Sequence, residues 1–258
     1  MMLFDTHAHY DDAQFEEDRN EVLQSLKESG VGLVLNPGAD LPSSRRAARL
    51  AQEYDFVYAA VGVHPHEAEG WNEEQAGEIR RLLKSPKVMA LGEIGLDYHY
   101  DLSPRPQQKR CFEEQLAIAK ELDIPVIIHE REAAQDCLEI LQRSGVKKGV
   151  YHCYSGSLET AKILVGMGFY LSFTGVITFK NARKAPEVIA WMPEDRIMIE
   201  TDSPYLAPEP KRGRRNDSRL LPYVNRRVAE LRGISEEEAA AITLRNGKTF
   251  FGIHSLQE

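Results

Sequence analysis

The chain has few cysteines and no long apolar run. Its 258 residues include three cysteines, Cys111, Cys137 and Cys153, which are odd in number and form no Cys-x-x-Cys pair. A disulfide framework and a cysteine zinc site are therefore both disfavoured. No apolar stretch approaches the roughly 18 residues of a membrane span, and Asp5 and His7 interrupt the apolar start. We expect no signal peptide, no membrane association and a reducing cytoplasm as the location.

Excess positive charge and a nucleotide-binding loop are also missing. The net charge of -8 disfavours a protein that coats nucleic acid non-specifically, although one basic cluster occurs at 211–215. Residues 246–249 (Asn-Gly-Lys-Thr) resemble the end of a phosphate loop. However, Ile242 stands where that motif needs its first glycine, and the segment follows an expected helix instead of a strand. We therefore expect no nucleotide cofactor.

Short apolar runs alternate with amphipathic segments along the whole chain. Eight such runs, rich in Val, Ile and Leu, predict strands buried on both faces; they are residues 2–6, 32–36, 56–63, 88–93, 125–129, 149–152, 168–173 and 196–200. A last helix is expected to begin at Ser235, with Glu238 completing a capping box. The pattern predicts a single domain over 1–258, a (β/α)8 TIM barrel with one extra C-terminal helix. A doubly wound open sheet has the same alternation and stays open.

Metal-ligand residue types follow several of these runs. His7 and His9 lie two apart in an extended segment, so both side chains point to the same face. Similar residues end later runs, namely Glu93, His129, His152 and Asp202. A single histidine at a strand end is more often structural than a ligand. The whole set is better explained by a metal site, because active sites of such barrels lie at the C-terminal strand ends.

The mixed donor set predicts a hydrolytic centre with two divalent ions. Imidazole with carboxylate suits Zn, Mn, Fe or Ni, whereas Mg prefers carboxylate and water. Two ions about 3.5–4 Å apart can polarise an acyl or phosphoryl oxygen and generate hydroxide. Glu93, between Gly92 and Gly95, is the candidate bridging ligand, and Asp202 would also orient or deprotonate the water. We expect Mg, Mn or Zn, with the identity open.

A phosphate-bearing substrate would need cations near that centre. Arg131 follows His129 by two residues, and the basic cluster with Arg214 and Arg215 follows Asp202. A charge run is commonly only a solvated surface, but arginine suits bidentate phosphate contact. We therefore predict substrate contacts from Arg131, Arg214 and Arg215, together with Tyr154.

At these residues the chain resembles the TatD family of metal-dependent hydrolases and DNases. The matching stretches, in order along the whole chain, are Asp5 to His9, Gly62 to His66, Gly92 to Tyr98, Pro125 to Arg131, His152 to Gly156, Glu200 to Leu206 and Asn246 to Gly252. The family often has Asn-Glu-Pro after its basic loop, whereas Asn216 is followed here by Asp217 and Ser218. Tyr154 stands where the family usually has Phe.

The resemblance implies a ligand set and an activity. It implies that His7, His9, Glu93 and Asp202 hold one ion and that Glu93, His129 and His152 hold the other. It also makes His64 an additional catalytic histidine near the scissile phosphate. The implied activity is cleavage of DNA, including exonuclease action from the 3′ end, with DNA as the partner. The sequence sets no oligomeric state, and a monomer is compatible with it.

Two other functions use the same residues. A hydrolase of a small ester, amide or lactone is the alternative, because the ligands do not distinguish C–O or C–N cleavage from P–O cleavage. A metal-stabilised binding module is the third hypothesis. The complete ligand set disfavours it, since a structural site does not need an open two-ion centre.

Overall fold

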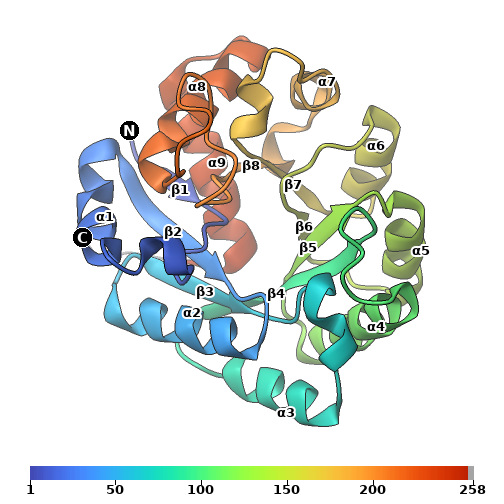
Figure 1. The fold of residues 1–258 in the computed structure, drawn as a ribbon. Helices are drawn as coiled ribbons and strands as arrows, with labels where there is room; N and C mark the ends of the chain where they lie inside the picture. The colour runs from blue at the N-terminus through green and yellow to red at the C-terminus, as the bar shows by residue number, and fades with distance from the viewer. Residues whose placement is uncertain (255–258) are drawn as a thin grey trace. The chain divides into compact units, whose positions relative to one another are not determined.

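The computed structural model describes residues 1–254, which contain eight parallel strands in one sheet, in the sequence order β1 to β8. Each strand is followed by an α-helix, and α9 is the extra C-terminal helix (Figure 1). Sequential order is the topology of a (β/α)8 barrel, whereas a doubly wound sheet would interchange strands. The predicted fold class is therefore confirmed. None of the helices in the described part of the chain combines the length and apolar character that a membrane crossing requires.

The chain forms two compact units, and each is described by itself. The first unit comprises residues 1–35 and the described residues from 153 onward, and the second comprises residues 36–152. The prediction of one domain over 1–258 stays a prediction.

The second unit is a run of strands and helices in strict alternation. It contains α2 (Leu41–Glu53), β3 (Val57–Val61), α3 (Glu73–Leu82), β4 (Val88–Asp97), α4 (Arg105–Leu122), β5 (Val126–Arg131), α5 (Ala134–Ser144), β6 (Gly149–Tyr151) and the 3-10 helix η3 (Pro65–Gly70). Parallel pairing joins β3 to β4, β4 to β5 and β5 to β6. Strand residues such as Ala60, Leu91 and Ile127 are fully buried, as expected for a sheet with both faces covered.

Helix starts in this unit follow local capping chemistry. Asp40 precedes α2, and its carboxylate accepts from the Ser43 N–H at 2.7 Å. Asn72 caps α3 in the same way by accepting from the Gln75 N–H at 3.0 Å. Such caps satisfy N–H groups that the first helical turn leaves without a partner. They fix where α2 and α3 begin after their strands.

Strand β4 is longer than predicted. It runs to Asp97, not to Glu93, and β5 runs to Arg131, not to His129. The pairing continues past the expected ends, with Gly95 opposite His129 and Asp97 opposite Arg131. Gly95 permits this because a Cβ there would lie 1.9 Å from the His129 carbonyl oxygen, and its φ is +147°. Glu93 and His129 are therefore held inside a paired ladder.

The first unit contains both ends of the chain. Its strands are β1 (Leu3–Asp5), β2 (Val31–Pro37, which continues into the second unit), β7 (Tyr170–Phe173) and β8 (Ile197–Ile199). Its α-helices are α1 (Arg19–Ser25), α6 (Leu158–Gly166), α7 (Lys184–Trp191), α8 (Leu221–Arg232) and α9 (Glu236–Phe251). Short 3-10 helices occur at Ala13–Phe15 (η1), Leu26–Ser29 (η2), Gly175–Thr178 (η4), Glu194–Arg196 (η5) and Ser218–Leu220 (η6). The Thr6 N–H and hydroxyl both donate to the Ile199 carbonyl, so β1 is tied to β8.

Helix α9 supports the start of β1 and β8. Ser235 caps it by accepting from the Glu238 N–H at 3.1 Å, which confirms the predicted start. The Asn246 amide donates to the carbonyls of Glu194 and Ile197, both at 2.8 Å. A Cβ on Gly247 would lie 2.6 Å from the Phe4 ring. The segment 246–249, which resembled a phosphate loop, thus lies within α9 and packs against β1 and the start of β8.

Replacing Gly95 by Ala tests the β4–β5 contact. We expect the variant to lose about 3 kcal/mol of unfolding free energy, because a Cβ at this φ collides with backbone. Gly77→Ala is the control, since the position lies inside α3 with nothing within 4 Å of an added Cβ. It should gain about 0.5–1 kcal/mol. Urea unfolding followed by circular dichroism measures both; equal stability of the two variants would contradict the assignment.

Candidate metal centre

One cluster of donors lies in the first unit, where β1 ends and the chain leaves β8. Nε2 of His7 and Nε2 of His9 are 3.1 Å apart. Oδ1 of Asp202 lies 3.7 Å from the first nitrogen and 3.6 Å from the second. These three residues form a group able to hold a metal ion. The structure thus brings together three of the predicted ligands.

Backbone pairing builds this cluster. The Asp202 N–H donates to the His7 carbonyl at 2.9 Å, and the His9 N–H donates to the Ser203 carbonyl at 2.7 Å. Asp202 adopts a φ of +56°, a left-handed conformation that Asp tolerates better than most residues. The segment after β8 therefore runs beside the segment after β1, and the carboxylate meets the two imidazoles.

The buried carboxylate of Asp5 holds the backbone around the first cluster. Asp5 accepts from the Thr201 N–H at 2.9 Å and from the hydroxyls of Thr201 and Ser218 at 2.6 Å each. Burial raises the pKa of Asp5 to about 7, although these hydrogen bonds oppose the shift. The network joins the end of β1 to the residues just after β8 and to η6. It fixes the backbone from which His7 and Asp202 project.

A second cluster lies in the second unit, on β4, β5 and the end of β6. Oε1 of Glu93 is 2.8 Å from Nδ1 of His129 and 2.7 Å from Nε2 of His152. The two imidazole nitrogens are 3.2 Å apart. All three side chains are mostly buried, with exposed fractions of 5%, 17% and 6% respectively. Three further predicted ligands are therefore within reach of a single ion.

Asp97 orients the second cluster. Its Oδ2 lies 3.2 Å from Nε2 of His129 and 2.9 Å from Nε2 of His66, while its Oδ1 accepts from the N–H groups of His99 and Tyr100. Burial alone would raise the pKa of Asp97, but the hydrogen bonds from His129, the Tyr100 N–H and His66 hold it below its usual range. The ionised carboxylate places the His129 proton on Nε2. Nδ1 is then left with a lone pair for a metal, as carboxylate–histidine pairs in metal sites do.

His64 has the same tautomer, but its Nδ1 is already engaged. That Nδ1 accepts from the His66 N–H at 3.2 Å, so the ring proton lies on Nε2, which is 3.7 Å from Oε1 of Glu93. Burial is the main cause that holds the pKa of His64 well below its usual range, so the ring is neutral. A neutral imidazole with Nδ1 engaged has no lone pair left on Nε2. Although His64 groups with Glu93 and His129 by distance, its hydrogen bonding suits a proton donor better than a ligand.

The two clusters fit divalent cations. Ligand bonds of about 2.0–2.2 Å place neighbouring donor atoms roughly 3.0–3.4 Å apart. The donor separations are 3.1 to 3.7 Å in the first cluster and 2.7 to 3.2 Å in the second. Both sets mix imidazole nitrogen with carboxylate oxygen, the combination that binds Zn or Mn. The chemistry of the donors therefore fits a metal ion in each cluster.

The predicted substrate contacts differ in their surroundings. Arg131 and Arg214 are exposed, and within residues 1–254 neither has an ion-pair partner. Arg215 instead pairs with Asp18, with Nη1–Oδ1 at 2.9 Å, and its guanidinium lies 4.6 Å from the Phe15 ring centre. Tyr154 is 4% exposed and its hydroxyl donates to the Ser157 carbonyl at 2.6 Å. Arg215 and Tyr154 thus make internal contacts, and the substrate contacts predicted for both stay predictions.

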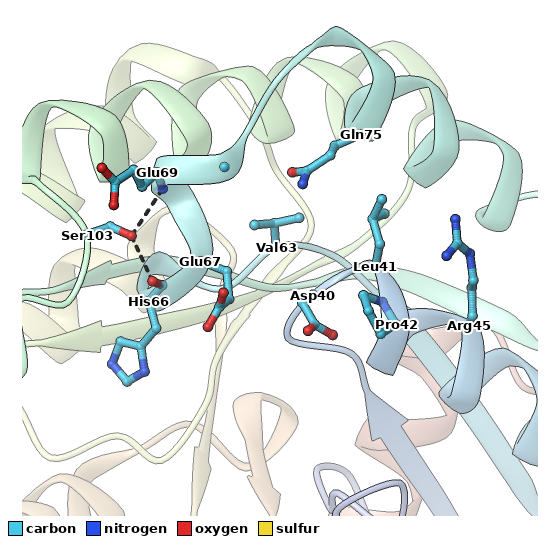
Figure 2. Close-up of a pocket in the computed structure, with 11 residues that line it drawn as sticks. Asp40, Leu41, Pro42, Arg45, Val63, His66, Glu67, Glu69, Gln75 and Ser103 are labelled. Carbon is cyan, nitrogen blue, oxygen red and sulfur yellow. Dashed lines mark hydrogen bonds between the residues drawn. The ribbon is translucent and has the colours of Figure 1, made fainter.

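A cavity of about 550 Å³ opens next to the second cluster. Its walls come from the start of α2, from η3 and from α3, and His66 contributes to it (Figure 2). Ser103 braces this wall by donating to the His66 carbonyl at 2.7 Å and accepting from the Glu69 N–H at 3.1 Å. Carboxylates of Asp40, Glu67 and Glu69 line the cavity. His66 is therefore shared by the cavity and, through Asp97, by the ligand cluster.

Comparison with known proteins agrees with this geometry. The family model described as TatD related DNase matches residues 4–252. The chain belongs to the TatD family. It is 46% identical to the uncharacterized metal-dependent hydrolase YabD of Bacillus subtilis, covering 98% of this chain and 100% of that protein. It is 35% identical to the 3′-5′ ssDNA/RNA exonuclease TatD of Erwinia amylovora, covering 97% and 100%.

A solved TatD structure has the same fold. The TatD homologue YjjV of Escherichia coli K12 superposes with a TM-score of 0.91 at 32% identity, covering 98% of each chain. The resemblance inferred from the motifs is thus confirmed. The protein is a metal-dependent hydrolase of the TatD family with His and Glu clusters suited to metal binding.

Asp97 received no role from the sequence alone, because the predicted strand ended at Glu93. The available signal was the pattern Glu93-Ile94-Gly95-Leu96-Asp97, in which residues two apart share a face of a continued strand. His66 was likewise left without a role.

Asp97→Asn tests the orienting carboxylate. An amide has one acceptor oxygen, so it cannot serve both the two imidazoles and the backbone N–H groups. We expect metal affinity to fall about 10- to 100-fold, measured by calorimetric titration of the chelated protein with Zn or Mn. Asp195→Asn is the matched control, because Asp195 is exposed, pairs with Arg196 and lies outside both clusters. Unchanged affinity in Asp97→Asn, with a native circular dichroism spectrum, would remove the role assigned to Asp97.

Proposed function

We propose that this TatD protein hydrolyses phosphodiester bonds in single-stranded DNA from the 3′ end, using two divalent ions. The observation that carries the proposal is that each unit presents three convergent donors, imidazole and carboxylate, within 3.7 Å of one another. The relative from Erwinia amylovora is named a 3′-5′ ssDNA/RNA exonuclease. Its 35% identity over nearly the whole chain supports the same substrate class here.

Six residues would hold the two ions. His7, His9 and Asp202 would hold one ion, and Glu93, His129 and His152 would hold the other. When bound, such ions lower the pKa of water and stabilise charge on the phosphoryl oxygens. That Glu93 ligates both ions stays a prediction.

Four residues have roles beyond metal binding in this proposal. The side chain of Asp202 is 15% exposed. It can orient the attacking water or accept a proton from it. Neutral His64 carries its proton on Nε2 and can donate a hydrogen bond to a phosphoryl oxygen. Arg131 and Arg214, exposed and without ion-pair partners in the described chain, would contact the phosphate backbone.

A hydrolase of a small ester, amide or lactone is the second candidate. One observation favours it: the cavity of about 550 Å³ falls within the range of about 300–1,000 Å³ that is usual for small-molecule sites. Assays of p-nitrophenyl acetate, a lactone and a single-stranded oligodeoxynucleotide with each of Mg, Mn and Zn separate the candidates. Turnover of acyl substrates alone would favour this second function.

Chelation and ligand substitution test the leading proposal. Removing metal with a chelator should abolish oligonucleotide cleavage, and readdition should restore it. Asp202→Asn and Glu93→Gln should each lower kcat at least about 1,000-fold, because each variant loses a metal ligand and Asp202→Asn also loses the proton acceptor. Glu69→Gln is the control, since Glu69 is exposed and outside both clusters. Cleavage by the two ligand variants at the wild-type rate, in folded protein, would refute the mechanism.

Metal analysis tests whether the two clusters bind separate ions. The wild-type chain should bind about two equivalents of Mn or Zn and His9→Ala about one, because only the first cluster loses a donor. His254→Ala is the control, because His254 is exposed and outside the clusters. Plasma emission spectrometry of dialysed protein gives the ratio. Two tightly bound ions in His9→Ala would contradict the assignment of that cluster.

A further inference from the structure

An exposed aromatic ring stands just beyond the end of β4. Tyr100 is 55% exposed, although it follows a strand whose last residues are fully buried. Single exposed aromatics are common on protein surfaces and need no function by themselves. Tyr100 differs because its position is fixed by the residue that orients a metal ligand.

Asp97 makes that connection with its two oxygens. Oδ1 accepts from the Tyr100 N–H at 2.9 Å, while Oδ2 lies 3.2 Å from Nε2 of His129. The Tyr100 ring also contacts His66 edge to face, with ring centres 5.5 Å apart and planes at 90°. The ring is therefore held in a defined place relative to the Glu93, His129 and His152 cluster.

A cation accompanies the ring. The Arg131 guanidinium lies 4.8 Å from the centre of the Tyr100 ring. The neighbouring carboxylates have other partners, since Glu132 pairs with His99 at 2.8 Å and Asp101 pairs with Arg105 at 3.1 Å. Within residues 1–254, Arg131 has no ion-pair partner, so its charge is available to an anionic ligand.

The cavity to which His66 contributes has the opposite charge. It is lined by Asp40, Glu67 and Glu69 (Figure 2). Its arginine, Arg45, pairs with Glu78 at 3.0 Å. Carboxylates repel a phosphate backbone, whereas an arginine beside an exposed aromatic ring matches the phosphate and base of one nucleotide. Electrostatics thus favours Tyr100 and Arg131 over the cavity as the place where a nucleic acid strand binds.

We propose that Tyr100 and Arg131 form a nucleotide-binding subsite, in which the tyrosine ring stacks on a base of the single-stranded substrate and the arginine contacts an adjacent phosphate. The inference rests on the proposed function and deepens it by naming the residues that recognise a single strand. Because stacking tolerates every base, the subsite selects unpaired nucleotides without selecting a sequence.

Kinetics on two substrates test the subsite. A short single-stranded oligodeoxynucleotide carries stacked bases, whereas methyl p-nitrophenyl phosphate is a phosphodiester without a base. Tyr100→Ala should raise KM for the oligonucleotide about 10-fold or more and leave kcat within about 2-fold. Tyr100→Phe keeps the ring and should behave as wild type. Cleavage of methyl p-nitrophenyl phosphate should not change in either variant.

Arg131→Ala tests the phosphate contact separately. It should raise KM for the oligonucleotide and reduce the slope of log affinity against log salt by about one, since one phosphate contact is lost. Trp191→Ala is the matched control, because Trp191 on α7 is also exposed and also lies beside a cation, Lys162 at 5.8 Å. It should leave both substrates unaffected.

The outcomes separate this inference from the proposed function. A wild-type enzyme that cleaves neither phosphodiester overturns the proposed function. Cleavage of both with unchanged KM in Tyr100→Ala overturns the subsite alone. Equal losses of activity on both substrates in Tyr100→Ala also overturn the subsite, because the role of the residue would then be structural. A Tyr100→Phe variant with a KM as high as that of Tyr100→Ala overturns it too, because the role would then belong to the hydroxyl. Fluorescence anisotropy of a labelled oligonucleotide with the Glu93→Gln protein gives the same test without hydrolysis.

Discussion

The buried carboxylate of Asp97 is the interaction on which the second cluster depends. It is 1% exposed, and burying a carboxylate is costly unless it is fully hydrogen bonded. Here four donors meet it, two imidazoles on Oδ2 and two backbone N–H groups on Oδ1. The carboxylate stays ionised for that reason, and an ionised Asp97 decides which nitrogen of His129 faces Glu93. One residue thus sets the tautomer of a ligand, the place of His66 and the turn that presents Tyr100.

The position of Asp97 depends in turn on the β4–β5 ladder. Asp97 reaches His129 only because β4 continues four residues past Glu93 in register with β5. The continuation requires Gly95, where any Cβ would collide with the His129 carbonyl. In the first unit a different backbone feature brings the ligands together. There the left-handed Asp202 turns the chain after β8 so that its N–H pairs with the His7 carbonyl. A close backbone approach therefore underlies both clusters.

These contacts explain which parts of the fold and of the two clusters could be predicted from the sequence. Apolar runs and their spacing predicted all eight strands, and the two-residue period predicted that His7 and His9 share a face. The residue pattern predicted that β4 ends at Glu93, because a polar residue after an apolar run commonly marks a strand end. The strand continues because Asp97 pairs with Arg131, and local patterns do not describe pairing with a neighbouring strand. The internal contacts of Arg215 and Tyr154 were outside the reach of local patterns for the same reason. Their partners, Asp18 and the Ser157 carbonyl, could be identified only from the fold.

The charge balance explains how an acidic chain can be suited to a nucleic acid strand. With a net charge of -8, long-range attraction to phosphate is weak, so recognition has to come from a few local contacts. The structure neutralises some cations internally, as it does Arg215 with Asp18, and leaves Arg131 and Arg214 exposed. Carboxylates line the cavity to which His66 contributes, whereas the Tyr100 ring contacts Arg131. Under this arrangement a duplex, which offers phosphates but no accessible base faces, gains only the arginine contacts. A single strand gains the ring of Tyr100 as well, and this difference in binding favours unpaired nucleic acid.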